Sequence, residues 1–276
     1  MGLLNNFQFS QSNLQDYLSC PRRFELRYIS RIKWPAPISE SFLEFEKHQK
    51  MGEMFHNMIN QYCLGVPVNL ILPPNSPPLI SQWWENFLIS FPLNKLPIIR
   101  FPEFKISVLE KSNRVIGRFD LLTIDTQGKI TIYDWKTSIN KVPVSRLVNS
   151  VQSRLYPILI VEGGKGLNNG LPFIPDQVEM VYWFPGFPDN SVTITYDTQK
   201  YFSDKQLINN LIFEIINLSQ NEFTKTAEEK NCRFCNFKSF CEINSSSEDW
   251  TSVENYFDES QFSFNINFDQ IAEVEY

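Results

Sequence analysis

The sequence predicts a mixed α/β fold, with helical segments on either side of a run of β-strands. Apolar residues recur at helical spacing in the first part of the chain, and segments rich in Val, Ile, Phe and Thr follow within residues 104–135. The 276 residues, 42% of them hydrophobic, can bury the core of one large domain or two small ones. The order helices, three strands, helix, strands, helix is that of a mixed α/β protein.

The N-terminal part carries the first helical patterns. Ser10 or Ser12 can cap a short helix, and Pro21 would begin the next turn. A second helix is expected over residues 42–63, because apolar side chains recur there at helical spacing: Met51, Met54, Phe55, Met58, Ile59 and Tyr62. The proline-rich stretch 66–78 ends this helix, and a helix with two adjacent tryptophans follows.

The rest of the chain alternates between the two patterns. Strands are expected over residues 104–109, 115–125, 130–135, 178–184 and 191–196. Helices are expected over residues 143–160 and 204–220. Between the second and third strands, a three-residue loop ending in Gly128 would pair Asp125 with Lys129.

Hydropathy and charge limit the location and the partners of the protein. Since no apolar run is long enough to span a membrane and the first ten residues lack a secretory signal, we expect a cytoplasmic protein without membrane contact. The net charge is −6, but residues 244–276 hold eight acidic residues and no Lys or Arg. With those eight set aside from the 31 acidic residues, the body has 25 basic and 23 acidic side chains, which neither supports nor excludes a basic DNA groove.

Two acidic residues and a lysine form the most informative pattern. The hairpin register places Asp120 opposite Asp134, and two facing carboxylates are unfavourable unless a cation lies between them. Strand alternation puts Asp134 and Lys136 on one face, which suits a Mg²⁺ or Mn²⁺ site that activates water against a phosphodiester. An Asp-x-Lys pair is also common on solvated strands, so the paired Asp120 is what favours the metal site.

Two helical pairs add to this pattern. Gly52 and His56 share one helix face, where glycine leaves room for the imidazole to approach a neighbour. Gln152 and Tyr156 share a face of a later helix, where an amide and a phenol could hold water or a phosphate. Each pair also has a plain interpretation, as an ordinary helix histidine and as one polar helix face. Pro157 is expected to bend the later helix.

These motifs, taken in order, resemble the RecB-type branch of the PD-(D/E)XK nucleases. The matching residues are Ser12, Leu14, Tyr17, Cys20, Pro21, Phe24, Gly52, His56, Gly117, Asp120, Asp134, Lys136, Gln152 and Tyr156. The resemblance implies a restriction-endonuclease-like core, with a mixed central sheet flanked by helices. It implies that His56, Asp120, Asp134 and the main-chain carbonyl of Trp135 bind the metal and that Lys136 is the catalytic lysine. Glu103 matches a further acidic ligand loosely.

The cysteines indicate a second metal site. Cys232, Cys235 and Cys241 gather three thiols within ten residues, and Cys20 is the natural fourth ligand. The resemblance to iron–sulfur members of the family, which include CRISPR-associated exonucleases and helicase-linked nucleases, implies a 4Fe-4S cluster that clasps the N- and C-terminal segments. Ligand spacing alone leaves Zn²⁺ open as the occupant. Cys63 is left over and is expected to pack as a small buried side chain.

The leading hypothesis is a metal-dependent DNA nuclease of residues 1–243, an exonuclease on single-stranded or end-containing DNA in repair, recombination or defence. Arg22, Arg23 and Tyr156 are candidate DNA contacts, and a repair or CRISPR-adaptation complex is a candidate protein partner. The alternatives are a catalytically silent DNA-binding or partner subunit and a zinc-ribbon interaction protein. The acidic, aromatic tail 244–276 could pack on the body, dock a partner, or mimic DNA over a basic groove.

Overall fold

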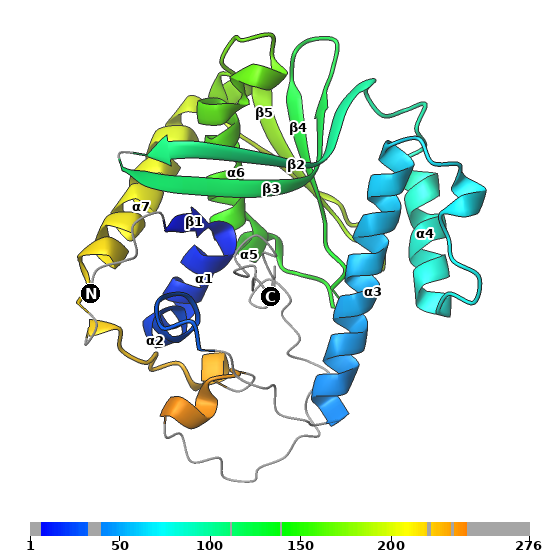
Figure 1. Ribbon diagram of the computed structural model, residues 1–276. Coiled ribbons are helices and arrows are strands. Elements are labelled where there is room, and N and C mark those ends of the chain that lie inside the picture. The colour runs from blue at the N-terminus through cyan, green and yellow to red at the C-terminus, as the bar shows by residue number, and fades with distance from the viewer. Residues whose placement is uncertain are drawn as a thin grey trace, which may run out of the picture.

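The computed structural model describes residues 7–32, 40–110, 112–138, 140–219, 222–232 and 235–241 (Figure 1). Six strands form one mixed sheet: β1 (Gln8–Ser10), β2 (Ile99–Glu110), β3 (Asn113–Ile124), β4 (Ile130–Trp135), β5 (Val178–Trp183) and β6 (Val192–Thr195). The α-helices are α1 (Gln11–Ser19), α2 (Pro21–Phe24), α3 (Glu40–Cys63), α4 (Pro78–Ser90), α5 (Val144–Val148), α6 (Val151–Gly163) and α7 (Thr198–Asn217). A π-helical turn (Glu25–Ile29) continues α2, and single 3₁₀ turns cover Val68–Leu70, Gly164–Leu167, Pro175–Gln177, Glu229–Cys232 and Lys238–Cys241.

The sheet has the order β1-β3-β4-β5-β6, and β2 pairs with the other edge of β3. The β3–β4 hairpin sets the register as expected: Asp125 N–H donates to the Lys129 carbonyl, and Gly128 takes a φ of +79° that favours glycine. The β2–β3 and β3–β4 pairs are antiparallel, whereas β4 and β5 are parallel. The expected mixed α/β architecture is confirmed.

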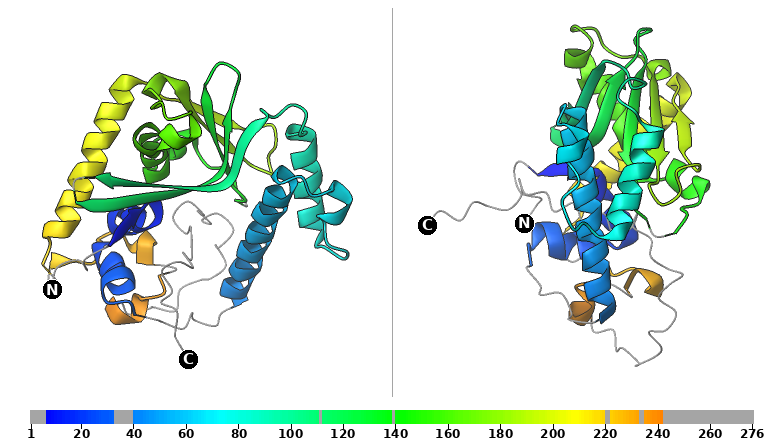
Figure 2. Two further views of the ribbon diagram at one scale, coloured as in Figure 1. Left: turned by 45° about the horizontal axis from the view of Figure 1, so that its top comes forward. Right: turned by 90° about the vertical axis from the view of Figure 1, so that its right-hand side faces the viewer.

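Helices cover both faces of the sheet and bury two cores. α6 and α7 lie against one face with α1, and this larger core includes Phe9, Leu14, Phe119, Leu159 and Ile212. On the other face, α3 and α4 enclose an aromatic core around Phe55, Trp83, Phe87, Trp135 and Trp183. The long β2–β3 ribbon runs from α7 to α3 (Figures 1 and 2). Because β4 and β5 contribute to both cores, they fix α3 relative to α6.

Local sequence signals explain several helix boundaries. Ser10 caps α1 by a reciprocal capping box with Asn13, as one of the two expected caps. The expected helix 143–160 divides into α5 and α6, because Ser150 adopts an extended conformation and caps α6 through Ser153 N–H. α6 continues through Pro157 to Gly163.

The other boundaries differ modestly from the sequence-based expectations. β2 begins at Ile99 rather than at residue 104, and α7 begins at Thr198, where Asp197 provides the N-cap. β1 was not expected, since three residues are too short for a strand pattern. Within the described ranges, none of the helices combines the length and hydropathy needed to cross a bilayer. The proposed tail 244–276 lies outside the described residues.

Candidate active site

The candidate site lies where the regular alternation of side chains between the two faces of the sheet is broken in β2 and β3. Phe119 and Leu122 both pack in the α6 core, whereas Leu121 packs in the α3–α4 core, so the two-residue alternation of β3 is interrupted at Asp120. On β2, the ladder skips Glu103, which has a φ of +50°. This left-handed conformation is strained for a residue with a side chain and is typical of functional sites. Both irregular residues carry a carboxylate.

A gap in strand pairing frees the second edge of β3 at the same place. β1 pairs with residues 114–116 and β4 with residues 121–124, so neither of these strands pairs with residues 117–120 on this edge. The carboxylate of Asp120 accepts a hydrogen bond from Trp135 N–H at 2.8 Å, and Tyr156 donates its hydroxyl to the Arg118 carbonyl at 2.8 Å. Side chains thus replace the missing main-chain partners.

Three potential ligands meet at this break. His56, Glu103 and Asp120 each offer one ligand atom, and these atoms lie within 4.8 Å of one another. Two carboxylates and an imidazole suit a divalent ion such as Mg²⁺ or Mn²⁺. The chemistry of this donor set therefore fits the metal expected from the sequence, and it brings the loosely matched Glu103 together with His56 and Asp120.

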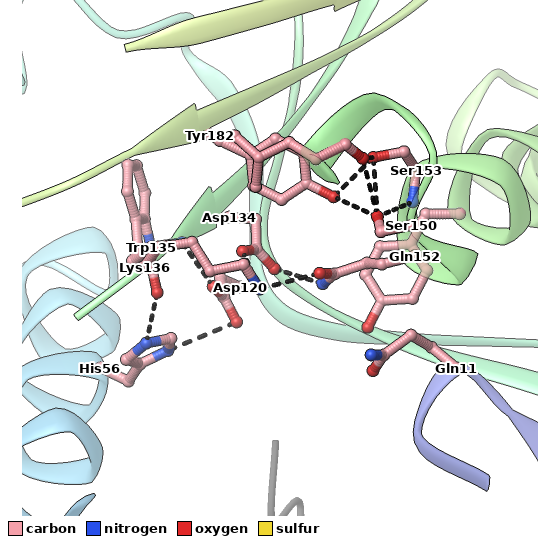
Figure 3. Close-up of polar contacts among 12 residues, drawn as sticks. Gln11, His56, Asp120, Asp134, Trp135, Lys136, Ser150, Gln152, Ser153 and Tyr182 are labelled. Atoms are coloured by element: carbon pink, nitrogen blue, oxygen red, sulfur yellow. Dashed lines mark hydrogen bonds and ion pairs between the residues drawn. The ribbon is translucent and has the colours of Figure 1, made fainter. Parts of the chain in front are cut away.

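His56 connects the group to the end of β4 (Figure 3). Its Nε2 donates to the Trp135 carbonyl at 2.9 Å, and its Nδ1 lies 3.4 Å from Asp120 Oδ1. Burial favours the neutral imidazole, but the carboxylate of Asp120 outweighs it, and the pKa of His56 rises to about 9. The imidazolium in turn holds the pKa of Asp120 below its usual range against the effect of burial. Without a metal, the positive charge of protonated His56 thus offsets part of the negative charge of Glu103 and Asp120.

Asp134, which is buried, and Lys136, which is half-buried, form an adjacent pair. Lys136 Nζ lies 2.8 Å from Asp134 Oδ2 and donates to Gln152 Oε1 at 2.8 Å, while Gln152 Nε2 donates to Asp134. Burial raises the pKa of Asp134 although Lys136 opposes it, and the raised pKa of Lys136 keeps the ammonium charged because Asp134 outweighs its burial. In this structure the Asp134 carboxylate thus faces Lys136 and Gln152.

α3 holds the end of β4 through three successive turns. His48, Gly52 and His56 are spaced by four residues and therefore share one helix face. His48 Nε2 donates to the Thr137 carbonyl at 2.5 Å, and a Cβ added at Gly52 would lie 2.7 Å from Thr137 Oγ1. The contact of His48 was not predicted, although its four-residue spacing from Gly52 was visible in the sequence.

Gly52→Ala should therefore disturb the site through Thr137. We expect a loss of roughly 1–3 kcal/mol of stability from overpacking and, since Lys136 adjoins Thr137, a fall of up to about 100-fold in kcat. The double variant Gly52→Ala/Thr137→Ala removes the clashing oxygen and should recover most of both, by thermal unfolding and single-turnover cleavage. A double variant as impaired as Gly52→Ala would show that the contact with Thr137 is not the cause.

A second group of side chains supports Lys136 from β5. The ammonium lies 5.4 Å from the centroid of the Tyr182 ring, and Tyr182 is directly opposite Asp134 in the sheet. The Tyr182 hydroxyl lies 2.8 Å from Ser153 Oγ, which links it to the first turn of α6 (Figure 3). Gln11, from α1, lies below Gln152 in the same view (Figure 3). The parallel pairing of β4 with β5 brings Tyr182 here, and no local pattern in the sequence indicates that contact.

The residues expected to contact DNA form ion pairs and hydrogen bonds within the chain. Arg23 is 5% exposed and forms an ion pair of 2.9 Å with Asp16. Arg22 pairs with Glu25, and Tyr156 is buried with its hydroxyl on the Arg118 carbonyl. These contacts stabilise the N-terminal segment and β3.

Residues next to two of the proposed cluster ligands connect the N-terminal segment to residues 222–232. Asn231 Nδ2 donates to the Ser19 carbonyl at 2.9 Å, and Phe223 stacks on Phe24 with centroids 6.0 Å apart. Burial is the largest cause that raises the pKa of Cys232, Cys235 and Cys241. The nearby Cys20 thiol acts in the same direction on all three. Thiols are the donors of iron–sulfur clusters and of structural zinc, but the Sγ atoms of these cysteines are not among the ligand atoms that meet within 4.8 Å in the described part of the chain. Cys63 lies apart, buried in the α3–α4 core as expected.

Comparisons with known proteins agree with the fold. The protein named "Putative exonuclease" from Eubacterium rectale has a similar structure, with a TM-score of 0.53 and 9% identity over 90% of this chain and 93% of its own. SSO0001 gives a TM-score of 0.41 and 14% identity over 88% of this chain and 89% of its own. No curated protein sequence matches. The model of the PD-(D/E)XK nuclease superfamily matches residues 8–242, most of the chain, and this protein therefore belongs to that superfamily.

Proposed function

We propose that this protein is a metal-dependent deoxyribonuclease that hydrolyses phosphodiester bonds, acting as an exonuclease on single-stranded or end-containing DNA in repair, recombination or defence. The observation that carries the proposal is the juxtaposition of the His56–Glu103–Asp120 group with the Asp134–Lys136 pair. A silent member of the superfamily would have no need to keep a charged lysine beside two carboxylates in a buried setting.

The residues take separate roles in this proposal. His56, Glu103, Asp120, Asp134 and the Trp135 carbonyl would hold the Mg²⁺ or Mn²⁺ ion, which supplies activation of water and neutralisation of phosphate charge when bound. Lys136 orients the attacking water and stabilises charge on the phosphate, because its ammonium stays protonated. Gln152 contacts both Asp134 and Lys136 and fixes their relative position.

A cleavage assay tests the proposal directly. Wild-type protein should shorten end-labelled single-stranded DNA in Mg²⁺ or Mn²⁺, with Lys136→Ala inactive in parallel. Circular single-stranded DNA without ends is the control for exonuclease action. Absence of metal-dependent cleavage on every DNA form would overturn the enzyme assignment, and rapid cutting of circles would overturn the exonuclease part alone.

Metal binding should release a proton from His56. Because the pKa of His56 is about 9 without metal, the imidazolium must lose a proton to become a ligand. Mn²⁺ affinity should therefore rise by up to about tenfold per pH unit between roughly pH 6.5 and 8.5. Calorimetry in buffers of different ionisation enthalpy counts the released proton. His56→Asn should lower the affinity and flatten this pH dependence, and an unchanged slope would remove His56 from the ligand set.

We further propose that Cys20, Cys232, Cys235 and Cys241 bind a 4Fe-4S cluster, with Zn²⁺ as the alternative occupant. The hydrogen bonds of Thr224 with Arg22 and of Asn231 with Ser19 support a shared site. Anaerobic purification followed by a visible spectrum and analysis of iron, sulfide and zinc distinguishes the two. Zinc at one equivalent without sulfide would replace the iron–sulfur assignment.

A further inference from the structure

One face of the β2–β3 ribbon is exposed and cationic. Strand alternation points Ile106, Val115 and Phe119 toward the α6 core. The opposite face carries six side chains, three of them basic and none acidic: Lys105, Ser107 and Leu109 from β2, and Arg114, Ile116 and Arg118 from β3. Five of the six are exposed, and Ile116 is half-buried. The positive charge of this face contrasts with the net charge of −6 of the whole chain.

The basic residues are arranged along the ribbon in a fixed register. Lys105 lies directly opposite Arg118 in the antiparallel ladder, so two positive charges lie side by side on this face. Arg114 lies four residues before Arg118 on the same face of β3, with Ile116 between them. Its Nη1 donates to Ser107 Oγ at 3.1 Å. The spacing from Arg118 to Arg114 is about 13 Å along the strand.

This face begins at the candidate active site. Arg118 Nε lies 2.8 Å from Glu103 Oε2. Glu103 is one of the three residues, with His56 and Asp120, whose ligand atoms lie within 4.8 Å of one another. The Arg118 side chain nevertheless remains 50% exposed. One side of its guanidinium is thus fixed by a candidate metal ligand, and the basic series extends away from that point toward the far end of the ribbon.

We propose that the exposed β2–β3 face, with Lys105, Arg114 and Arg118, binds the phosphodiester backbone of the DNA strand that enters the site. The inference deepens the proposed nuclease function and depends on it for the identity of the strand. The ribbon supplies positive charge along an extended path, and base edges are not read, so binding depends on salt and is independent of sequence. Arg118 contacts the phosphate nearest the metal, and Lys105 and Arg114 contact phosphates further from it.

The test is the salt dependence of DNA binding. Lys136→Ala protein, in which the DNA is expected to stay intact, is titrated with fluorescent single-stranded and duplex oligonucleotides at several KCl concentrations. Adding Lys105→Gln or Arg114→Gln should lower the slope of log K against log salt by about 0.7 on single strands or about 0.9 on duplex for each lost contact. The double substitution should lower it by about twice as much. A strand type whose slope falls by the amount given for it is bound on this face, and a strand type whose slope does not change is not.

The control is Lys165→Gln in the same background. Lys165 is exposed just beyond Gly163, which packs on Ile106 and Val108 on the opposite side of the ribbon. This variant should leave the slope unchanged. Mn²⁺ affinity should also stay unchanged in Lys105→Gln and Arg114→Gln, because neither residue belongs to the metal group.

The outcomes separate this proposal from the proposed function. If wild-type protein cleaves DNA while Lys105→Gln/Arg114→Gln keeps the full salt slope, the nuclease assignment stands and the ribbon assignment falls. If the ribbon variants lose slope but wild-type protein never cleaves, DNA binding on this face stands and the enzyme assignment falls. A wild-type protein that binds neither DNA form would overturn the ribbon proposal as well.

Discussion

Asp120→Asn should abolish metal-dependent DNA cleavage, with a loss on the order of 10³-fold or more in kcat. The substitution keeps an oxygen that can accept the Trp135 N–H bond, so the strand contact at the break in β3 survives. It removes the charge that pairs with His56 and that would bind the metal. The loss should therefore appear in metal affinity and turnover, whereas the fold remains.

Asp125→Asn is the matched control. Asp125 lies at the end of the same β3–β4 connection, and its carboxylate accepts main-chain N–H bonds from Gln127 and Lys129. Both variants thus change an aspartate that binds main-chain amides, but only Asp120 lies in the candidate metal group. Single-turnover cleavage, Mn²⁺ titration and thermal unfolding should show Asp125→Asn close to wild type. Full cleavage by Asp120→Asn would remove the metal site from this position.

The order of elements and the register at the site could be predicted because local signals set them. The turn ending in Gly128 fixes the β3–β4 pairing, and this pairing continues to Leu121 opposite Tyr133, one step before Asp120 and Asp134. Helical spacing likewise placed His56 on a single long helix. Both predictions rest on neighbours in sequence, for which periodicity is a sufficient guide.

The rest of the site depends on contacts between distant segments. Glu103 reaches His56 and Asp120 because its backbone adopts a left-handed φ. Glutamate normally avoids this conformation, so the sequence around it does not predict it. Tyr182 reaches Lys136 only because β5 pairs in parallel with β4 after the long α5–α6 connection. The split between α5 and α6 was missed for a local reason: Ser150 and the apolar residues around it also suit a continuous helix.

Cys20→Ser should destabilise the protein while leaving the candidate active site intact. Cys20 and Cys232 are 212 positions apart, so a metal group bound to both closes a very long loop. By analogy with other cross-links, losing that closure costs roughly 5 kcal/mol, which lowers the melting temperature by roughly 10 °C. Iron or zinc content should fall with the stability, and anaerobic chelator treatment of wild-type protein should produce the same shift.

Cys63→Ser separates this effect from the loss of any buried thiol. Burial in the α3–α4 core raises the pKa of Cys63 to about 11, which keeps it a neutral thiol, and the residue lies apart from the other four cysteines. Cys63→Ser should keep the full metal content and lose only the packing stability of one small side chain. In Cys20→Ser, Mn²⁺ affinity at His56 and Asp120 should match wild type below the melting temperature, because α3 packs in the α3–α4 core and β3 is held in the sheet by β2 and β4. A Cys20→Ser protein with unchanged metal content and melting temperature would show that the N-terminal segment contributes no ligand, and the contacts of Asn231 and Phe223 would then be sufficient to hold the two ends together.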